Sequence, residues 1–568
     1  MPKTMIEFKN VTFRYNAQAE PTLKNINLQI NEGEKVLVVG PSGSGKSTLG
    51  NLINGIIPEN FRGDLSGEIY IDGKDAKDMS IFDTSLKVGT LLQNSNDQFV
   101  GLTVAEDIAF GMENDCFDNP TMRAKVNQWS NKLSINNLLK QAPNNLSGGQ
   151  KQRTGLAGLL VDDSPILLLD EPLAALDPMA GHESIQLLQD LHNELKNTIV
   201  IIEHRLEESL TQDIDKIVLM DDGEIVGIYH PAELLKKNIL NKYGIREPLY
   251  IEALKKMGVS LNTLNEIDSV EKVNGPEVAD RIKKVSANVK PISNYNDSDD
   301  ILSIKKLSFS YGKKEIFDNL NVDIQKGDMV SLVGKNGVGK TTLSKLIVGF
   351  LTPNAGEIKF NGESLLNKSI KERADDIGYI MQDPDKMISK VMIYDEVALG
   401  LKLRHYPKAQ IKAKVNHALK ICNLYPFRNW PISALSYGQK KRLTIASMLV
   451  LSPKLLILDE PTAGQDYYHY TEIMNFLRKL NHEQALTMIF ITHDMHLMAE
   501  YSTRTLVIGD HNILRDNTPA KVLDDEQLLA KANLRRTSLS ILAKRFNVKY
   551  NDFSNYLIGK ERDNQYEQ

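Results

Sequence analysis

Two glycine-rich segments of the chain have the composition of a phosphate-binding loop. Each follows a short apolar run and fits the pattern G-x-x-x-x-G-K-[ST], at residues 40–47 and 334–341. Glycines let backbone N–H groups curve around phosphate oxygens at the start of a helix, the lysine adds a positive charge, and the final hydroxyl is a ligand for Mg²⁺. The residues expected to hold the phosphates are Gly40, Ser42, Gly43, Ser44, Gly45, Lys46, Ser47, Thr48, Gly334, Asn336, Gly337, Gly339, Lys340, Thr341 and Thr342, with Ser47 and Thr341 as magnesium ligands.

A pair of adjacent carboxylates follows a buried-strand pattern in each half of the chain. Asp170 and Glu171 come directly after one apolar run, and Asp459 and Glu460 come after another. Open α/β sheets bind their ligands at the carboxyl ends of such strands. We expect Asp170 and Asp459 to orient Mg²⁺ or its waters, and Glu171 and Glu460 to polarise an attacking water as general bases.

The two halves of the chain repeat one another. The phosphate-binding loop recurs after 294 residues (334 − 40), and later motifs recur after 289 residues (382 − 93). Such constant spacing indicates one duplicated domain of the α/β class. Each copy is expected to have a parallel sheet core, an antiparallel β subdomain and a helical subdomain. The predicted divisions are a first domain at 1–240, a linker with possible helices at 241–299, a second domain at 300–515 and a helical, polar extension at 516–568.

Composition narrows the classes of function. The chain has 568 residues and a formal charge of −5, so it lacks the overall basic charge that favours nucleic-acid binding. Its apolar runs are far shorter than the ~20 residues that cross a bilayer. The two cysteines, Cys116 and Cys422, have no metal-ligand spacing and are expected to be buried. The N-terminal segment lacks the pattern of a signal peptide, which predicts a cytosolic, reducing compartment.

Residues 146–150, Leu-Ser-Gly-Gly-Gln, closely resemble the signature of ABC-type ATPases. The resemblance implies that the two domains pair head to tail as a pseudo-symmetric intramolecular pair, with the signature of one copy closing over ATP and Mg²⁺ held by the other. Family positions carried over to this chain are Ser147, Gly148, Gly149, Gln150, Ser436, Gly438 and Gln439 as signature contacts to ATP, Tyr15 and Tyr311 as adenine-stacking aromatics, Gln93 and Gln382 as Q-loop residues that sense Mg²⁺, His204 and His493 as switch histidines, and Asp177 and Asp466 as D-loop aspartates.

The two copies differ at the signature. The second reads Leu-Ser-Tyr-Gly-Gln at residues 435–439, with Tyr437 in place of a glycine. Because the resemblance implies that the halves exchange signatures, this variant would serve the ATP bound at Lys46. That site is therefore expected to hydrolyse ATP more slowly, although both copies keep the glutamate and the histidine.

Residues 96–111 are similar to the segment of energy-coupling factor (ECF) ATPases that docks a transmembrane partner, and residues 382–400 are a looser version. The resemblance implies an ATPase that energises uptake of a vitamin, a vitamin precursor such as a thiamine-related pyrimidine, or a transition-metal ion. It also implies two integral-membrane partners, a scaffold component and a substrate-binding component that selects the cargo. The chain would then be peripheral, on the cytoplasmic side of the cell membrane.

Three alternatives remain at this point. Ribosome-associated ABC-F proteins carry a glutamate at the position of Gln150 and a long charged helical linker, whereas this chain has Gln150, Gln439 and a linker interrupted by proline and asparagine. The fused ATPase of a sugar importer would differ only in its membrane partner. A protein that binds ATP without hydrolysing it is disfavoured by Glu171 and Glu460.

Overall fold

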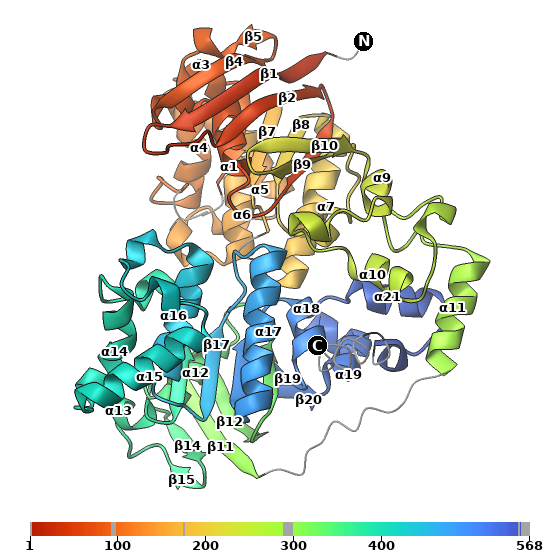
Figure 1. Ribbon diagram of the computed structural model, residues 1–568. Helices are drawn as coiled ribbons and strands as arrows, with labels where there is room; N and C mark the ends of the chain where they lie inside the picture. Colours follow the sequence, from red (N-terminus) through yellow and green to blue (C-terminus); the bar gives the residue numbers. More distant parts are fainter. Residues whose placement is uncertain (1–2, 93–97, 174–175, 288–298, 555–556, 558–568) are drawn as a thin grey trace. The chain divides into compact units, whose positions relative to one another are not determined.

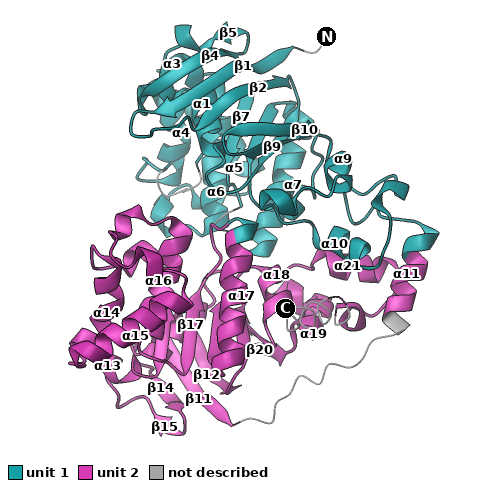
Figure 2. Ribbon diagram, viewed as in Figure 1, with its two compact units in different colours: residues 1–278, 466–468 teal, residues 279–465, 469–568 magenta. Residues whose placement is uncertain are grey.

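The structure repeats one arrangement of strands and helices in the two halves of the chain (Figure 1). It is a computed structural model that describes residues 3–92, 98–173, 176–287, 299–554 and 557. The chain folds into two compact units, one of residues 1–278 with 466–468 and the other of residues 279–465 with 469–568 (Figure 2). Each unit contains an antiparallel sheet, a mostly parallel sheet and covering helices, as the sequence predicts.

In the first unit the sheets follow from two different residue patterns. Alternating apolar and polar residues form the antiparallel sheet, of order β2-β1-β4-β5, which buries one face. Continuous apolar runs form the parallel part of the sheet of order β10-β9-β3-β8-β7-β6, and β10 pairs with β9 antiparallel. The strands are β1 Thr4–Tyr15, β2 Leu23–Asn31, β3 Lys35–Val39, β4 Gly63–Ile71, β5 Lys74–Asp75, β6 Val88–Leu91, β7 Ile166–Asp170, β8 Thr198–Ile202, β9 Lys216–Asp221 and β10 Glu224–Tyr229.

The second unit has the same two sheets. Its antiparallel sheet has the order β12-β11-β14-β15, and its mostly parallel sheet has the order β16-β17-β18-β13-β19-β20. In both units the strand that precedes the phosphate-binding loop lies beside the strand that precedes the histidine motif. The strands are β11 Asp300–Tyr311, β12 Lys314–Gln325, β13 Met329–Val333, β14 Ala355–Phe360, β15 Glu363–Ser364, β16 Ile377–Ile380, β17 Leu455–Asp459, β18 Thr487–Ile491, β19 Arg504–Gly509 and β20 Asn512–Asn517.

Some helices begin at side chains that accept hydrogen bonds from the backbone N–H groups of the first turn, whereas α1 and α12 begin at glycines without such a cap. Thr103 caps α4 in a capping box with Glu106, and Asp118 caps α5. The α-helices of the first half are α1 Lys46–Ile53, α2 Ile56–Glu59, α3 Ile81–Ser85, α4 Val104–Asn114, α5 Asn119–Lys132, α6 Gly148–Leu160, α7 Pro178–Leu195, α8 Leu206–Ser209, α9 Pro231–Lys236, α10 Leu249–Lys256 and α11 Pro276–Ala287. Those of the second half are α12 Lys340–Val348, α13 Ile370–Arg373, α14 Ile393–Leu403, α15 Lys408–Ile421, α16 Tyr437–Leu449, α17 Tyr467–Gln484, α18 Met495–Tyr501, α19 Pro519–Asp524, α20 Glu526–Lys531 and α21 Ser538–Arg545.

In each unit a hydrophobic cluster joins the two sheets to the helix after the phosphate-binding loop. In the first unit Phe8 and Phe13 of β1 pack in the same cluster as Leu49 of α1 and Leu168 of β7. In the second unit the equivalent cluster contains Phe317 of β12. The phosphate-binding loop and the carboxylate strand are therefore held by the same hydrophobic packing, which fixes their relative position.

The structure tests two expectations from composition, one about membrane-spanning segments and one about burial of the two cysteines. No helix among the described residues is long and apolar enough to span a bilayer. Cys422 is buried as expected, but the prediction for Cys116 is wrong because this residue is exposed. Cys116 lies in the turn after α4 with φ of 58°, where the chain leaves the helix and the side chain faces away from the core.

A buried cation in β3 distinguishes the two copies. Lys35 is 1% exposed, and Met329 occupies the equivalent position of β13. The Lys35 ammonium group donates a hydrogen bond to Gln189 Oε1 at 2.6 Å. Burial nevertheless lowers the pKa of Lys35 from 10.5 to about 8, although Asp213 and Asp215 oppose the shift.

Replacing Lys35 by the methionine of the second copy should stabilise the protein. Between about pH 8 and 10.5 the folded chain binds fewer protons at this site than the unfolded chain, so the Lys35 contribution makes wild-type stability rise with pH. At pH 7 the buried charge is a cost, and we expect Lys35→Met to raise the free energy of unfolding by about 1–3 kcal/mol and to remove this pH dependence. Urea unfolding at pH 7 and 9.5 measures both effects.

The reciprocal variant, Met329→Lys, is the matched control and should destabilise the protein at pH 7. A loss of stability in Lys35→Met at pH 7 would show instead that the hydrogen bond to Gln189 outweighs the burial of charge.

Candidate functional site

The first phosphate-binding loop lies between β3 and α1, where backbone segments approach too closely for a side chain. A Cβ atom at Gly40 would lie 2.3 Å from the Met220 carbonyl oxygen, so only glycine fits there. Gly45, the N-cap residue directly before α1, has φ of 97°. Lys46 is 5% exposed, and its Nζ donates hydrogen bonds to the carbonyl oxygens of Gly40 at 2.9 Å and Pro41 at 2.8 Å. The lysine is thus held over its own loop.

The second loop, between β13 and α12, has the same construction. A Cβ at Gly334 would lie 2.4 Å from the Ile508 carbonyl oxygen. Lys340 is 6% exposed, and its Nζ donates hydrogen bonds to the carbonyl oxygens of Gly334 at 2.7 Å and Lys335 at 3.0 Å. The first backbone N–H groups of an α-helix have no partner within the helix, so the start of α1 and of α12 is a favourable place for an anion.

The strand-end aspartates lie beside these loops in a poorly solvated environment. Burial, with a contribution from Glu171, raises the pKa of Asp170 to about 6. Its Oδ1 is buried and has no hydrogen-bond partner among the described residues. In the second unit Asp459 Oδ2 accepts hydrogen bonds from Thr341 Oγ1 and Tyr379 Oη, both at 3.1 Å. Burial raises the pKa of Asp459 as well.

This donor set fits Mg²⁺. A carboxylate and a hydroxyl oxygen beside a phosphate-binding loop are the ligands that Mg²⁺ takes when it also binds substrate phosphates and waters. Among the described residues no group of three or more His, Cys, Asp or Glu side chains forms a metal cluster of protein ligands alone. A site that shares Mg²⁺ with a nucleotide does not need one.

The glutamates and histidines meet at the carboxyl ends of neighbouring strands. Glu171 and Glu460 both have φ of 46°, a conformation that costs energy for a side chain of this kind. Their N–H groups donate to the last carbonyl oxygens of β8 and β18 at 2.8 and 2.9 Å, which holds this turn in place. The nearest oxygen of Glu171 lies 3.2 Å from His204 Nε2, and that of Glu460 lies 3.6 Å from His493 Nε2.

The signature residues form the start of a helix in each unit. Ser147 Oγ accepts a hydrogen bond from the Gln150 N–H, and Gln150 Oε1 accepts one from the Ser147 N–H. Ser436 and Gln439 form the same capping box at α16. The glutamine of the motif therefore has a structural role. Among the described residues, neither Ser147 nor Ser436 forms a hydrogen bond with the phosphate-binding loop of its own unit.

The two predicted adenine-stacking tyrosines have different surroundings, and the tyrosine of the variant signature contacts one of the Q-loop glutamines. Tyr15 Oη lies 3.1 Å from Thr48 Oγ1, which places that ring beside the first loop, whereas Tyr311 is 45% exposed. Tyr437 of the variant signature donates a hydrogen bond from its hydroxyl to the Gln382 carbonyl oxygen at 3.4 Å. Gln93 lies outside the described residues.

Sequence reasoning missed one buried group in the first site. Glu203 is 2% exposed, and its carboxylate accepts hydrogen bonds from the backbone N–H groups of Leu173, His204 and Arg205. It links the loop after β7 to the loop after β8. The available signal was the charged residue directly before His204, where the second copy has Thr492.

A second missed group lies on the helix after the variant signature. Lys441 Nζ donates a hydrogen bond to the Glu460 carbonyl oxygen at 3.0 Å, and burial lowers the pKa of Lys441 to about 8. The equivalent residue, Gln152, donates to the Pro172 carbonyl oxygen at 2.8 Å. Both side chains support the loop that carries the glutamate.

Comparisons with known proteins agree with this geometry. The family model described as "ABC transporter" matches residues 23–174 and 317–463. An ABC transporter ATP-binding protein of Enterococcus faecalis is 52% identical over 546 residues, which cover 96% of each chain. This chain belongs to the ABC transporter ATP-binding family. It is thus an ATPase of that family, with two tandem ABC domains that bind ATP.

Other findings add detail about relatives. An ABC transporter ATP-binding protein of Lactiplantibacillus plantarum is 49% identical over 564 residues, 99% of this chain and 100% of its own. A family model described as "ATP-binding cassette cobalt transporter" matches residues 237–309. The solved structure of cbiO1 from Clostridium perfringens, part of the ABC transporter complex cbiONQ, is 33% identical over 44% of this chain and all of its own, with a TM-score of 0.39.

Glycines in the second ABC domain offer a test of how tightly the loop must be packed. Gly337 and Gly339 both have positive φ, 78° and 113°. A Cβ at Gly337 would meet nothing within 4 Å, whereas one at Gly339 would lie 2.7 Å from both Ile316 and Phe317 side chains. We expect Gly337→Ala to cost about 1–2 kcal/mol of stability from its backbone conformation alone.

Gly339→Ala should cost more, because the added methyl group also displaces β12 side chains of the core, and it should weaken ATP binding at least tenfold. Urea unfolding and equilibrium dialysis with ATP measure the two effects. Equal losses in the two variants would mean that contact with β12 does not set the requirement for glycine.

Proposed function

We propose that this ABC ATPase energises substrate uptake by an ECF-type importer, with a transition-metal ion as the favoured cargo and a vitamin or vitamin precursor as the alternative. The observation that carries this proposal is the cobalt-transporter family match at residues 237–309, the segment between the two ABC domains. The ECF-like sequence at residues 96–111 supports it independently. Cargo selection would reside in a membrane partner, since substrate specificity belongs to sites and not to a fold.

The geometry of each unit supports the following proposed roles in hydrolysis. Lys46 and Lys340, with the loop N–H groups, bind the β- and γ-phosphates of ATP. Glu171 and Glu460 accept a proton from the attacking water, and their contacts with His204 and His493 keep them oriented toward it. Each histidine would contact the γ-phosphate and stabilise the transition state.

Magnesium would be held by Ser47, Asp170 and Gln93 in the first domain and by Thr341, Asp459 and Gln382 in the second. When bound, Mg²⁺ neutralises charge that develops on the phosphate oxygens. The hydrogen bond from Thr341 to Asp459 supports this assignment, because the two oxygens lie 3.1 Å apart, close enough to bind the same ion.

The two ABC domains are proposed to act as a head-to-tail pair. Ser147 with Gly149 would complete the site at Lys340, and Ser436 with Gly438 would complete the site at Lys46. Closing on ATP and reopening after hydrolysis would transmit force to a scaffold component and a substrate-binding component in the membrane. The chain would associate peripherally, on the cytoplasmic face of the cell membrane.

Removing the proposed general bases should separate hydrolysis from binding. We expect Glu171→Gln and Glu460→Gln together to lower ATP turnover by about 10²–10⁴-fold while leaving ATP binding intact, because the amide cannot accept the proton. Steady-state phosphate release and equilibrium dialysis measure the two quantities. Glu59→Gln, at an exposed glutamate of the first domain, is the control and should leave both unchanged.

The single variants test the pairing of the domains. Glu460→Gln should lower turnover more than Glu171→Gln, since the second site would face the intact signature. Equal losses of ATP turnover in the two single variants would refute the predicted difference between the sites. Normal turnover in the double variant would refute the general-base assignment.

Transport is tested with the tagged chain purified from its native membranes. We expect integral-membrane proteins to co-purify, and cells that express the complex to accumulate radioactive cobalt or nickel. The double glutamine variant should assemble normally but abolish accumulation. Co-purification of the tagged chain with ribosomes, or with the permease of a sugar importer, would contradict the proposal.

A further inference from the structure

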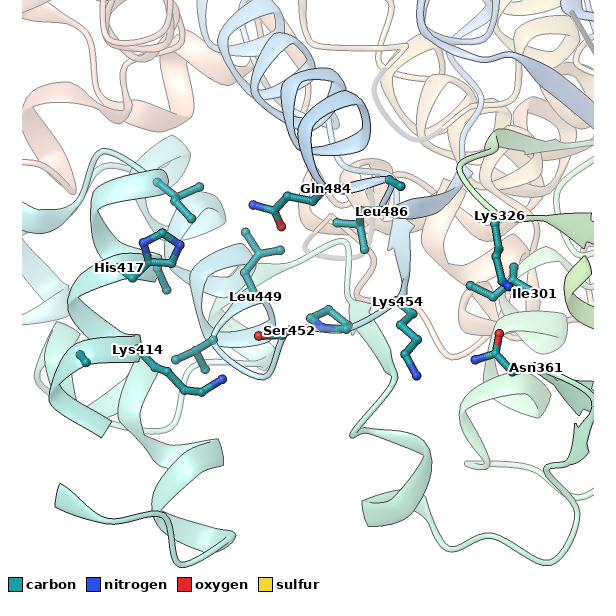
Figure 3. A pocket seen from close by; sticks show the side chains of 16 residues that line it. Ile301, Lys326, Asn361, Lys414, His417, Leu449, Ser452, Lys454, Gln484 and Leu486 are labelled. Atoms are coloured by element: carbon teal, nitrogen blue, oxygen red, sulfur yellow. The ribbon is translucent and has the colours of Figure 1, made fainter. Parts of the chain in front are cut away.

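A pocket of about 610 Å³ opens in the second unit, and its lining contains none of the residues predicted to bind the nucleotide (Figure 3). Lys454 directly precedes β17 and Leu486 directly precedes β18, and both line it. Asp459 ends β17 and His493 follows β18, at the opposite edge of the same sheet. The pocket has the size of a small-molecule site, and it is separate from the ATP site.

The pocket combines an apolar wall with positive charge. Val450 and Leu486 are 3% exposed and form part of the wall. Lys326, Lys414 and Lys454 contribute ammonium groups from three different segments, as Figure 3 shows. Among the described residues that line the pocket there is no aspartate or glutamate. A ligand with one anionic end and an apolar body would match both features.

Two of the three lysines have carboxylate partners that do not line the pocket. Lys454 pairs with Asp376 at 2.8 Å, and Lys326 pairs with Asp299 at 3.5 Å. Lys414, on α15, has no ion pair within the described part of the chain, and its Nζ lies 5.8 Å from the centre of the Tyr406 ring. Lys414 is therefore the cation that an anionic group would neutralise most directly.

The duplicated domain provides an internal comparison, because positions in this region are related by 289 residues (414 − 125). In the first unit Lys125, the equivalent of Lys414, pairs with Asp163 at 2.7 Å. Lys132 at the end of α5 also pairs with Glu194 of α7 at 2.5 Å. Two ion pairs thus cross the equivalent position and satisfy its lysines internally.

Both ion pairs are absent from the described residues of the second unit, because one member of each has changed. Ser452 replaces the aspartate opposite Lys414, and Ile421 replaces the lysine at the end of the helix. Glu483, which remains, lies 3.8 Å from Lys479 on its own helix. The loss of these ion pairs leaves Lys414, Ser452 and Ile421 to line the pocket's open space together.

The opposite wall changes in the same direction. Asp72 of the first unit pairs with Lys3 and Lys87, and its equivalent that lines the pocket is Asn361. Lys326 occupies the position of Glu32, after 294 residues. In the lining of the pocket, Lys326 and Asn361 thus replace the acidic Glu32 and Asp72 of the first copy.

We propose that this pocket is a binding site for a small organic anion. Its carboxylate or phosphate group would contact Lys414 and the Ser452 hydroxyl, at the positions of the paired Lys125 and Asp163, and its apolar body would lie against Ile421 and Leu486. The charge-assisted hydrogen bonds supply specificity, and burial of the apolar body supplies affinity.

Ligand-observed NMR on the full-length protein tests this site with octanoate and octyl phosphate as probes, which also distinguishes the two head groups. Wild-type protein should bind at least one of them saturably at millimolar concentration or below, and binding should weaken as salt is raised. Octylammonium, of equal chain length but opposite charge, should bind at least tenfold more weakly.

The decisive variant restores the first copy's residues, Ser452→Asp with Ile421→Lys. Aspartate tolerates this position because Asp163 has φ of 53° where Ser452 has 58°. We expect anion binding to fall at least tenfold, with ATP hydrolysis unchanged as a sign that the variant is folded. The matched control, Asp163→Ser with Lys132→Ile, should leave anion binding unchanged.

Absence of saturable anion binding, equal binding of octylammonium, or undiminished binding in the Ser452→Asp, Ile421→Lys variant would each overturn the proposal. Loss of binding in the first-copy control would place the site in the other unit and would also overturn it.

Discussion

The structure depends on holding opposite charges together in the poorly solvated space at the carboxyl edge of each parallel sheet. Burial lowers the pKa of Lys46 to about 8 and raises that of Asp170 to about 6, so each group is displaced toward its neutral form. A nucleotide phosphate favours the charged lysine, and a divalent cation favours the charged aspartate. Magnesium and a triphosphate bound together would therefore compensate both groups.

The backbone imposes a second constraint on the same place. In the first unit β3 lies beside β8 and β8 beside β7, so the loops after these strands are neighbours by topology. Close backbone approach requires glycine at Gly40, and positive φ at Glu171 turns that carboxylate toward His204. Strain that is held in place by strand hydrogen bonds is common at functional sites. Here it lies at the residue proposed to activate water.

Much of this arrangement was predictable because it is local in sequence. The loop pattern, the carboxylate pairs and the fixed spacing of the copies determine which strand ends carry polar groups, and the two-sheet architecture follows from the residue patterns. The domain limits and the roles of individual site residues stay predictions. Exposure of Cys116 was not predictable, because it depends on where a helix ends. Glu203 was missed because its role lies in hydrogen bonds to two loops that are distant in sequence.

The pocket of the second unit could not be predicted from the sequence either, because it lies where ion pairs of the first unit are missing. Comparison of the two copies shows how it arises. Helices α5 and α15 have equal lengths and begin and end 289 residues apart, as do α7 and α17 (408 − 119, 467 − 178). Where the copies keep this register, they differ in individual side chains: a methionine for Lys35, a threonine for Glu203 and a serine for Asp163.

These substitutions change charge while they leave the hydrophobic clusters that join sheet to loop in place. Core packing tolerates few changes of volume, whereas a charge on a half-buried surface can be removed once its partner is removed as well. A duplicated domain can therefore keep one nucleotide-binding architecture twice and still acquire different electrostatic properties in each copy. The two halves therefore share a fold and differ in the charges of particular side chains.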